Sequence, residues 1–155
     1  MPSSAKVRKE VLDLLSKQNP AAGQTIIDVG SGWGNLIIPI ARSFPQTQVI
    51  GYELSLLPWL ACLLIKKILR LNNLKLYRQD FLKADIPQDS ILTCYLHPKG
   101  MKKLKRYLQQ REQIASTVIS IYFSLPGWNE TAFKETRVIR IKDLYQTPVY
   151  LYQQS

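Results

Sequence analysis

The feature that most constrains this sequence is a glycine-rich turn placed directly after a short apolar segment. Residues 25–30 are mostly apolar and β-branched, which is typical of a parallel strand buried on both faces. The turn at 30–34 follows with the sequence GSGWG, and residues 36–42 then fit a helix. Glycines let a backbone turn sharply and approach a ligand, and the next helix offers free N–H groups. A strand, turn and helix in this order predict an α/β fold with a ligand site at the turn.

The remaining sequence continues the alternation of strands and helices. Further strands are expected at residues 48–54, 74–80, 91–96, 116–123, 136–143 and 147–153. Further helices are expected at 56–71 and 99–111, and a helix capped by Ser3 or Ser4 precedes the first strand. Crossovers between parallel strands are right-handed, and the short loop at 146–148 favours an antiparallel pairing of the last two strands. The predicted fold class is therefore α/β: a doubly wound, mostly parallel seven-stranded Rossmann-like sheet with a C-terminal antiparallel hairpin.

The length of 155 residues fits one domain, so we expect residues 1–155 to form a single unit. Within it, residues 1–24 are expected to supply an N-terminal helix and linker, and residues 25–155 the Rossmann-like core. The longest apolar run, 54–65, has 12 residues, short of the roughly 20 that span a bilayer, and no signal peptide is evident. We therefore expect no transmembrane segment and a cytoplasmic protein, with peripheral contact to a membrane surface left open.

The sequence is strongly basic. Lys and Arg outnumber Asp and Glu by 21 to 11, which gives a net charge of +10. This charge favours anionic partners such as RNA or an acidic membrane surface, or simply keeps a basic protein soluble. Two cysteines, Cys62 and Cys94, and one histidine, His97, are too few for a disulfide framework or a His/Cys metal cluster. No metal is therefore expected, and the cysteines are expected to fill the core.

An acidic residue at the end of the second expected strand indicates a nucleoside ligand. Glu53 lies 23 residues after Gly30, where a carboxylate can accept hydrogen bonds from both hydroxyls of a ribose. The dinucleotide pattern G-x-G-x-x-G requires a third glycine where Asn35 stands, and the spacing here is G-x-G-x-G. This spacing favours an amino-acid-bearing nucleoside, whose ammonium group Asp28 attracts and whose carboxylate meets the N–H groups of the loop. The alternative is a tight turn beside a solvated glutamate.

Three motifs together resemble those of the class I S-adenosylmethionine-dependent methyltransferases. They are DVGSGWG at 28–34, GYE at 51–53 and QDF at 79–81. The resemblance spans nearly the whole chain and implies S-adenosyl-L-methionine as the cofactor. The cofactor-binding residues that it implies are Asp28, Gly30, Ser31, Gly32, Gly34, Glu53, Leu54, Asp80 and Phe81.

The resemblance also implies a role for each of these residues. The loop at 30–34 wraps the methionine part of the cofactor, with Asp28 nearby. Glu53 binds the ribose, and Asp80 accepts a hydrogen bond from the adenine amino group. Leu54 or Phe81 packs on the adenine ring. For Asp80, a turn-forming role at the end of a strand is the alternative.

Other segments resemble one subfamily: the protein-lysine methyltransferases that modify adenine nucleotide translocase and the ATP synthase c-subunit in mitochondria, with small prokaryotic relatives. They are residues 2–4, 51–54, 58–60 and 124–128. The resemblance implies a protein substrate, which for the mitochondrial members is membrane-embedded. Two departures stand out. The sequence shows no hydrophobic segment before the domain, and residues 96–99 replace the N-P-P-Y-like motif of other amine methylators.

Methylation of lysine requires a neutral amine, although free lysine has a pKa of about 10.4. Burial of the amine lowers this pKa because it destabilises the cation. His97 follows the strand expected at 91–96, at the edge of the sheet where substrates approach, and is the candidate catalytic residue that takes or relays the proton. The alternative is a loop histidine at the start of a helix.

Two helices offer candidate surfaces for a partner. In the helix at 99–111, Met101, Leu104 and Leu108 share one face. The rest is covered by the basic residues Lys99, Lys102, Lys103, Lys105, Arg106 and Arg111. This basic face is either solvated or binds an anionic partner such as RNA. The helix at 56–71 is apolar almost all round, so it is either sandwiched or a docking surface, and it suits a membrane surface.

The sequence favours an S-adenosylmethionine-dependent methyltransferase that acts on a protein lysine. Two alternatives stay open. The charge of +10 suits an RNA methyltransferase. The missing motif after the fourth strand leaves room for a module that binds S-adenosylmethionine without turnover.

Overall fold

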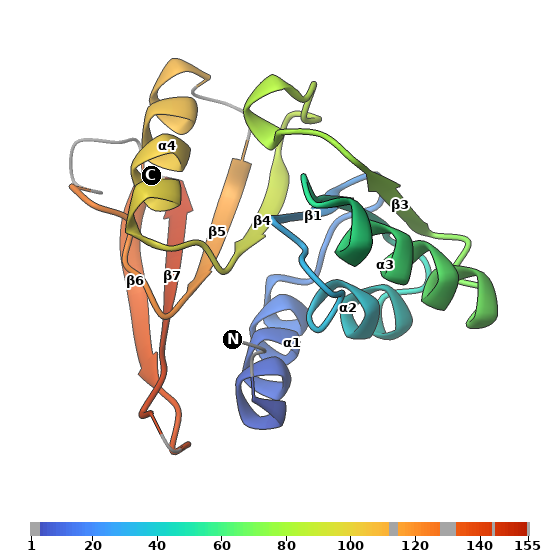
Figure 1. The fold of residues 1–155 in the computed structure, drawn as a ribbon. Helices are drawn as coiled ribbons and strands as arrows, with labels where there is room; N and C mark the ends of the chain where they lie inside the picture. The colour runs from blue at the N-terminus through green and yellow to red at the C-terminus, as the bar shows by residue number, and fades with distance from the viewer. Residues whose placement is uncertain (1–3, 112–114, 128–132, 144, 155) are drawn as a thin grey trace.

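The computed structural model describes residues 4–111, 115–127, 133–143 and 145–154 (Figure 1). The helices are α1 (Ala5–Gln18), α2 (Ile37–Ser43), α3 (Leu56–Ile68) and α4 (Pro98–Gln110), with a short 3-10 helix η1 (Phe81–Lys83). The strands are β1 (Thr25–Val29), β2 (Gln48–Tyr52), β3 (Leu74–Tyr77), β4 (Ser90–Cys94), β5 (Ala115–Ile121), β6 (Phe133–Arg140) and β7 (Pro148–Gln154).

The strands form one seven-stranded sheet in the order β3-β2-β1-β4-β5-β7-β6. Strands β1 to β5 are parallel, and β7 pairs antiparallel with both β5 and β6. Strand order reverses beside β1, because β2 lies on one side of it and β4 on the other. The predicted doubly wound sheet with its closing antiparallel pair is confirmed, and a ligand is expected outside the carboxyl ends of β1 and β4.

Helices cover both faces of the sheet, and each face has its own apolar core. Figure 1 shows α1, α2 and α3 close to one another and α4 apart from them. On one face Ile26 of β1 packs in a cluster with side chains of α1 and α2. On the other face Ile27 packs in a cluster with side chains of α4. All five residues of β1 are buried, as predicted for a strand between two layers.

The N-terminal helix begins where the sequence predicts. The Ser4 hydroxyl accepts a hydrogen bond from the Val7 N–H at 3.3 Å, so it caps α1. Asn19 ends the helix in the left-handed conformation, with φ of 46°. The buried residues of α1 are Val7, Val11, Leu14 and Leu15, whose three- and four-residue spacing places them on one face of the helix. Ser3 lies outside the described residues, and the assignment of residues 1–155 to one domain stays a prediction.

Several predicted strand ends are wrong because local turns stop the strands. Strand β3 ends at Tyr77 instead of residue 80, since Asp80 caps the unpredicted helix η1. Strand β6 ends at Arg140 instead of residue 143, because Asp143 organises the turn to β7. The Asp143 carboxylate accepts hydrogen bonds from the Thr147 N–H at 2.9 Å and the Thr147 hydroxyl at 2.8 Å. These hydrogen bonds also lower the pKa of Asp143.

Helix α3 is not sandwiched between layers. Among its residues only Cys62 is buried, so the alternative in which α3 is sandwiched is wrong, and the alternative of a docking surface stays a prediction. Cys62 and Cys94 both lie in the interior, which confirms their predicted place in the core. In the described part of the chain, no helix is long and apolar enough to cross a membrane.

Candidate functional site

A cavity of about 560 Å³ opens at the carboxyl ends of β1, β4 and β5. It is lined by Asp28, Gly30, Ser31, Gly32, Trp33, Asn35, Leu36, Tyr95, His97, Ile121 and Phe123. Five of the predicted site residues are in this lining: Asp28, Gly30, Ser31, Gly32 and His97. The cavity therefore joins the predicted cofactor loop on one side with the predicted acceptor side on the other.

The glycine loop adopts a backbone conformation that other residues rarely take. The φ angles of Gly30, Gly32 and Gly34 are 80°, 52° and 82°. A Cβ added at Gly34 would lie 2.9 Å from the Cys62 sulfur and 2.9 Å from Ile38 Cγ1. At Gly32 a Cβ would meet nothing closer than 4.0 Å, so there the missing side chain leaves open space beside the cavity. The loop forms a cradle in which backbone N–H groups can approach a ligand.

Two side chains form hydrogen bonds with the peptide groups of this loop: Glu53, which follows β2, and Cys62 of α3. Glu53 accepts a hydrogen bond from the Gly32 N–H at 2.8 Å and another from the Ser55 N–H at 2.7 Å. The Cys62 thiol donates to the Gly32 carbonyl at 3.3 Å, and burial raises the pKa of this thiol to about 11. Glu53 is thus part of the loop structure, unlike the solvated glutamate of the alternative interpretation. Its two oxygens retain acceptor capacity for further hydrogen bonds, such as those of ribose hydroxyls.

Asp28 places a buried carboxyl group at the wall of the cavity. It is 3% exposed and accepts a hydrogen bond from the Thr93 hydroxyl at 3.0 Å, across the pairing of β1 with β4. Burial raises the pKa of Asp28 to about 7, Glu53 adds to the rise, and the hydrogen bond from Thr93 opposes it. A cationic ligand group would stabilise the charged carboxylate and lower this pKa. The arrangement suits an ammonium group in the cavity.

Ser31 gives independent evidence for a polar ligand. Its hydroxyl oxygen is buried, and it has no hydrogen-bond partner among the described residues. Buried hydroxyls almost always have a partner, so an unsatisfied one beside a cavity indicates a bound water or a ligand atom. The cradle, the buried carboxyl of Asp28 and this hydroxyl together fit an amino acid group carrying an ammonium and a carboxylate.

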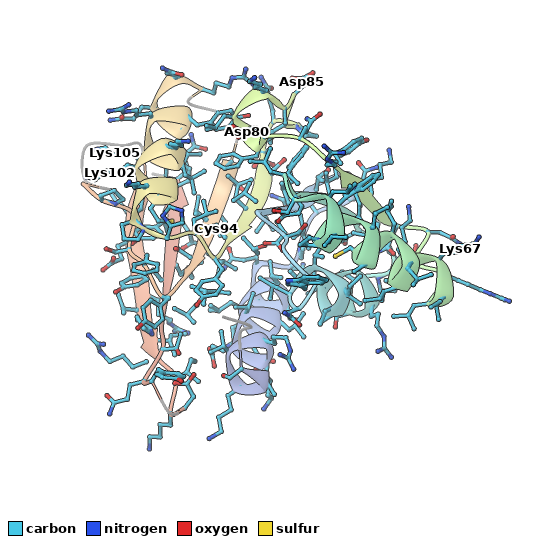
Figure 2. All side chains as sticks on the ribbon, viewed as in Figure 1. Lys67, Asp80, Asp85, Cys94, Lys102 and Lys105 are labelled. Atoms are coloured by element: carbon cyan, nitrogen blue, oxygen red, sulfur yellow. The ribbon has the colours of Figure 1, made fainter. Side chains whose placement is uncertain are left out.

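The predicted adenine-binding residues lie at the same edge of the sheet but do not line this cavity. Asp80 accepts a hydrogen bond from the Leu82 N–H at 3.0 Å and caps η1, which is the turn-forming role of the alternative interpretation. Phe81 packs edge-on against Tyr107 of α4, with ring centroids 6.0 Å apart. Leu54 is 63% exposed beyond the end of β2. Figure 2 shows Asp80 on the segment that follows β3.

The acceptor side of the cavity contains aromatic residues that the sequence did not predict. Tyr95, at the end of β4, and Phe123, after β5, line it together with His97. Between them Tyr122 adopts a φ of 74° and packs edge-on against both rings, with centroids 6.5 Å from Tyr95 and 4.9 Å from Phe123. His97 itself is exposed at the N-cap position of α4 and makes no capping hydrogen bond with its side chain. The signal that could have found Tyr95 and Phe123 is their position at strand ends.

Comparison with known proteins assigns the family. A model of the ANTKMT methyltransferase domain matches residues 28–132, which include the glycine loop, Glu53, Asp80 and His97. The chain belongs to this family. A protein-lysine N-methyltransferase of Saccharolobus islandicus (strain REY15A) is 26% identical over 156 residues, covering 98% of this chain and 91% of the relative.

Solved structures of other methyltransferases share the fold of this family member. An RNA methyltransferase from Salinibacter ruber, in complex with S-adenosyl-L-homocysteine, matches with a TM-score of 0.76 and 23% identity, covering 99% of this chain and 94% of that one. A magnesium protoporphyrin IX methyltransferase from Synechocystis PCC 6803, with bound SAM, matches with a TM-score of 0.76 and 16% identity, covering 97% and 79%. The predicted class I methyltransferase fold is thereby confirmed, the family is that of a methyltransferase, and both of these solved structures hold S-adenosylmethionine or its demethylated product.

The basic helix of this methyltransferase divides into a packed and an exposed face. Met101, Leu104 and Leu108 of α4 are buried as predicted, and Tyr107 joins them. Arg111, the C-cap residue of α4, is exposed, and its guanidinium donates to the Ala84 carbonyl at 3.4 Å and lies 5.1 Å from the Tyr107 ring centroid. The basic residues within α4 itself are Lys99, Lys102, Lys103, Lys105 and Arg106. Among the described residues, no cluster of three or more His, Cys, Asp or Glu side chains could hold a metal ion.

Proposed function

We propose that this chain transfers a methyl group from S-adenosylmethionine to the side-chain amine of a lysine in a protein. Its family and the name of its Saccharolobus islandicus relative support this acceptor over RNA. The observation that carries the proposal is the single cavity lined by the glycine loop and by an aromatic wall beside His97. A bound cofactor and the amine of a lysine side chain can therefore contact each other inside this one cavity.

The cofactor side is proposed to act through the residues that hold its amino acid and ribose groups. Ionised Asp28 pairs with the ammonium group, and the N–H groups of the loop at 30–34 meet the carboxylate. Glu53 accepts from the ribose hydroxyls while it keeps the Gly32 peptide in place. Asp80, with Leu54 or Phe81, binds the adenine. Once bound, S-adenosylmethionine supplies an electrophilic methyl group on a sulfonium, and the chain's contribution is to position the acceptor in line with it.

The acceptor side is proposed to bind the lysine amine against aromatic rings. The faces of Tyr95 and Phe123 attract an ammonium group as it enters, and partial burial then favours its neutral form. Burial also raises the pKa of Tyr95, so its phenol stays protonated and is a poor base near neutral pH. Imidazole is the side chain best suited to accept a proton there, and His97 has access to solvent for passing it on.

The proposal is tested by labelling. Incubation of the protein with methyl-labelled S-adenosylmethionine and cell fractions should give a product that protease removes and ribonuclease does not. Acid hydrolysis of the labelled product should release methylated lysine. Gly34→Ala serves as the inactive control, because its added Cβ would collide with Cys62 and Ile38. Label that ribonuclease removes would establish the RNA methyltransferase instead, and absence of any label above the Gly34→Ala background would contradict both.

A further inference from the structure

Helix α3 exposes a continuous stripe of aliphatic side chains. The exposed fractions of Leu57, Leu60, Leu64 and Ile68 are 68%, 45%, 60% and 68%. At about 100° per residue, these four side chains fall within about 80° of one another around the helix axis. Exposed leucines are common singly, but a contiguous row on one helix face indicates an interaction surface. We call this row the α3 stripe.

The α3 stripe lies on a helix that is firmly held from its other side. Cys62 is fully buried against the glycine loop, and the Trp59 indole N–H donates to the Leu76 carbonyl of β3 at 3.4 Å. The helix is therefore a fixed part of the fold, and its exposed face is available to a partner without any rearrangement. Leu54, two residues before α3, is 63% exposed. Trp33, which follows the Gly32 bonded to Cys62 of α3, is 59% exposed and lines the cofactor cavity.

Positive charge borders the C-terminal end of the α3 stripe. The helix contains no acidic residue, and Lys66 and Lys67 lie in its last turn, followed by Arg70. Here the surface is hollowed by a pocket of about 530 Å³. Its lining is Leu63, Lys66, Lys67, Arg70, Leu71 and Asn72. A row of leucines beside a pocket of lysine and arginine matches the two parts of an anionic phospholipid, its acyl chains and its phosphate.

We infer that α3 docks this methyltransferase on an anionic membrane surface, with the α3 stripe in the interfacial layer and the basic pocket on lipid phosphates. This inference goes beyond the proposed function and does not depend on the identity of the acceptor. A second copy of the chain is the less favoured occupant, because each copy carries a net charge of +10 and symmetric pairing brings like charges together. Trp33, exposed beside the cavity, suits the polar–apolar boundary of a bilayer. Docking in this orientation brings the cofactor cavity close to substrates at the membrane.

The test measures sedimentation of the full chain with phosphatidylcholine vesicles made with and without phosphatidylglycerol. The wild type should bind only the vesicles that contain phosphatidylglycerol. Leu57→Gln with Leu64→Gln should weaken this binding by at least about tenfold, since both side chains lose apolar contact with the lipid. Lys67→Glu with Arg70→Glu should weaken it by at least about 25-fold.

Matched controls separate α3 from the rest of the surface. Lys102→Glu with Lys103→Glu makes the same change of charge on α4, and Val138→Gln makes a similar polar change at a residue that is 42% exposed on β6. Figure 2 shows Lys102 on the opposite side of the molecule from Lys67. Both controls should bind vesicles within about threefold of wild type, and all variants should keep wild-type affinity for S-adenosylhomocysteine, which shows that they are folded.

Four results would each overturn the inference. The first is a wild type that does not sediment with phosphatidylglycerol vesicles. The second is an equal loss of vesicle binding in the variant with Lys102→Glu and Lys103→Glu, which would mean that the net charge of the protein and not the position of the basic residues determines binding. The third is unchanged binding after both leucine substitutions. The fourth is a dimer, seen by analytical ultracentrifugation, that the leucine substitutions dissociate, since the α3 stripe would then be covered by a second copy.

Discussion

Replacing Asp28 by Asn should stabilise the protein while it impairs cofactor binding. The pKa of Asp28 is raised from 3.8 to about 7, chiefly because burial penalises the charged carboxylate. The unfolded chain therefore ionises near pH 4, whereas the folded chain keeps the proton until about pH 7. Folding stability is lost progressively across this window, and the loss is complete above it. Since one pKa unit is worth about 1.4 kcal/mol, the penalty at pH 8 is at most about 4 kcal/mol.

The neutral amide introduced by Asp28→Asn would carry no such penalty. Its side-chain oxygen can still accept the hydrogen bond that Thr93 donates to Asp28 at 3.0 Å. The free energy of unfolding of Asp28→Asn should therefore exceed that of wild type by about 2–4 kcal/mol at pH 8 and by almost nothing at pH 4. Loss of the charged partner should weaken S-adenosylmethionine binding by roughly 10- to 150-fold.

Urea unfolding of both proteins, repeated between pH 4 and pH 8.5, measures this difference. Asp143→Asn provides a control of opposite sign. Hydrogen bonds from Thr147 lower the pKa of Asp143, so its carboxylate stabilises the fold above pH 4 and that contribution is lost as the pH falls further. Asp143→Asn should accordingly destabilise the protein at neutral pH. A difference between wild type and Asp28→Asn that stays constant from pH 4 to pH 8 would refute the argument, because Asp28 would then be solvated.

The remaining predictions concern the cofactor and the acceptor. Cofactor affinity, measured by calorimetry, should fall about tenfold per pH unit below pH 7, since only ionised Asp28 pairs with the ammonium group; constant affinity from pH 5 to 7 would contradict this pairing. Gly34→Ala should destabilise the fold by about 1–3 kcal/mol, measured by urea unfolding, because its Cβ would lie 2.9 Å from the Cys62 sulfur at a φ of 82°. Glu53→Ala should weaken cofactor binding by roughly 10- to 150-fold, and unchanged affinity would assign Glu53 no part in it. His97→Ala should slow turnover by roughly 10²-fold without changing cofactor affinity, and full activity would leave desolvation as the route to the neutral amine.

The order of the elements could be predicted because it follows from periodicity within each segment. The apolar run at 25–30 and the hairpin loop at 146–148 are local signals, and both have their predicted place in the sheet. The ends of the strands were missed because local turns override the strand pattern: Asp80 caps η1 after β3, and Asp143 organises the turn from β6 to β7. The exposure of α3 depends on how far the neighbouring layers reach, and this property is not encoded in one segment.

The residues of the site also divide into those that one segment predicts and those that depend on the pairing of strands. The loop at 30–34 could be predicted because its chemistry is contained in one stretch of backbone. Thr93 was missed, since its hydrogen bond to Asp28 follows from the pairing of β4 with β1, which requires the strand order. Tyr95 and Phe123 come from β4 and the end of β5 and meet only when those strands pair. The sequence therefore predicted several lining residues on the cofactor side of the cavity, and on the acceptor side it predicted only His97.

Three locally unfavourable features of this chain lie at or beside one cavity. Asp28 buries a carboxyl group, Ser31 buries a hydroxyl that has no partner among the described residues, and Tyr122 holds a φ of 74° between Ile121 and Phe123, both of which line the cavity. Each feature costs free energy in the protein alone, of order 1–3 kcal/mol for the backbone of Tyr122 or for an unsatisfied hydroxyl. If stability alone decided these positions, Asn would be favoured over Asp28, Ala over Ser31 and Gly over Tyr122. A bound ammonium group offsets the cost at Asp28, and a polar ligand atom or an ordered water offsets it at Ser31. The buried carboxyl of Asp28 and the unsatisfied hydroxyl of Ser31 at one cavity are the physical argument that the fold is built around a ligand, and this argument is independent of any resemblance to other proteins.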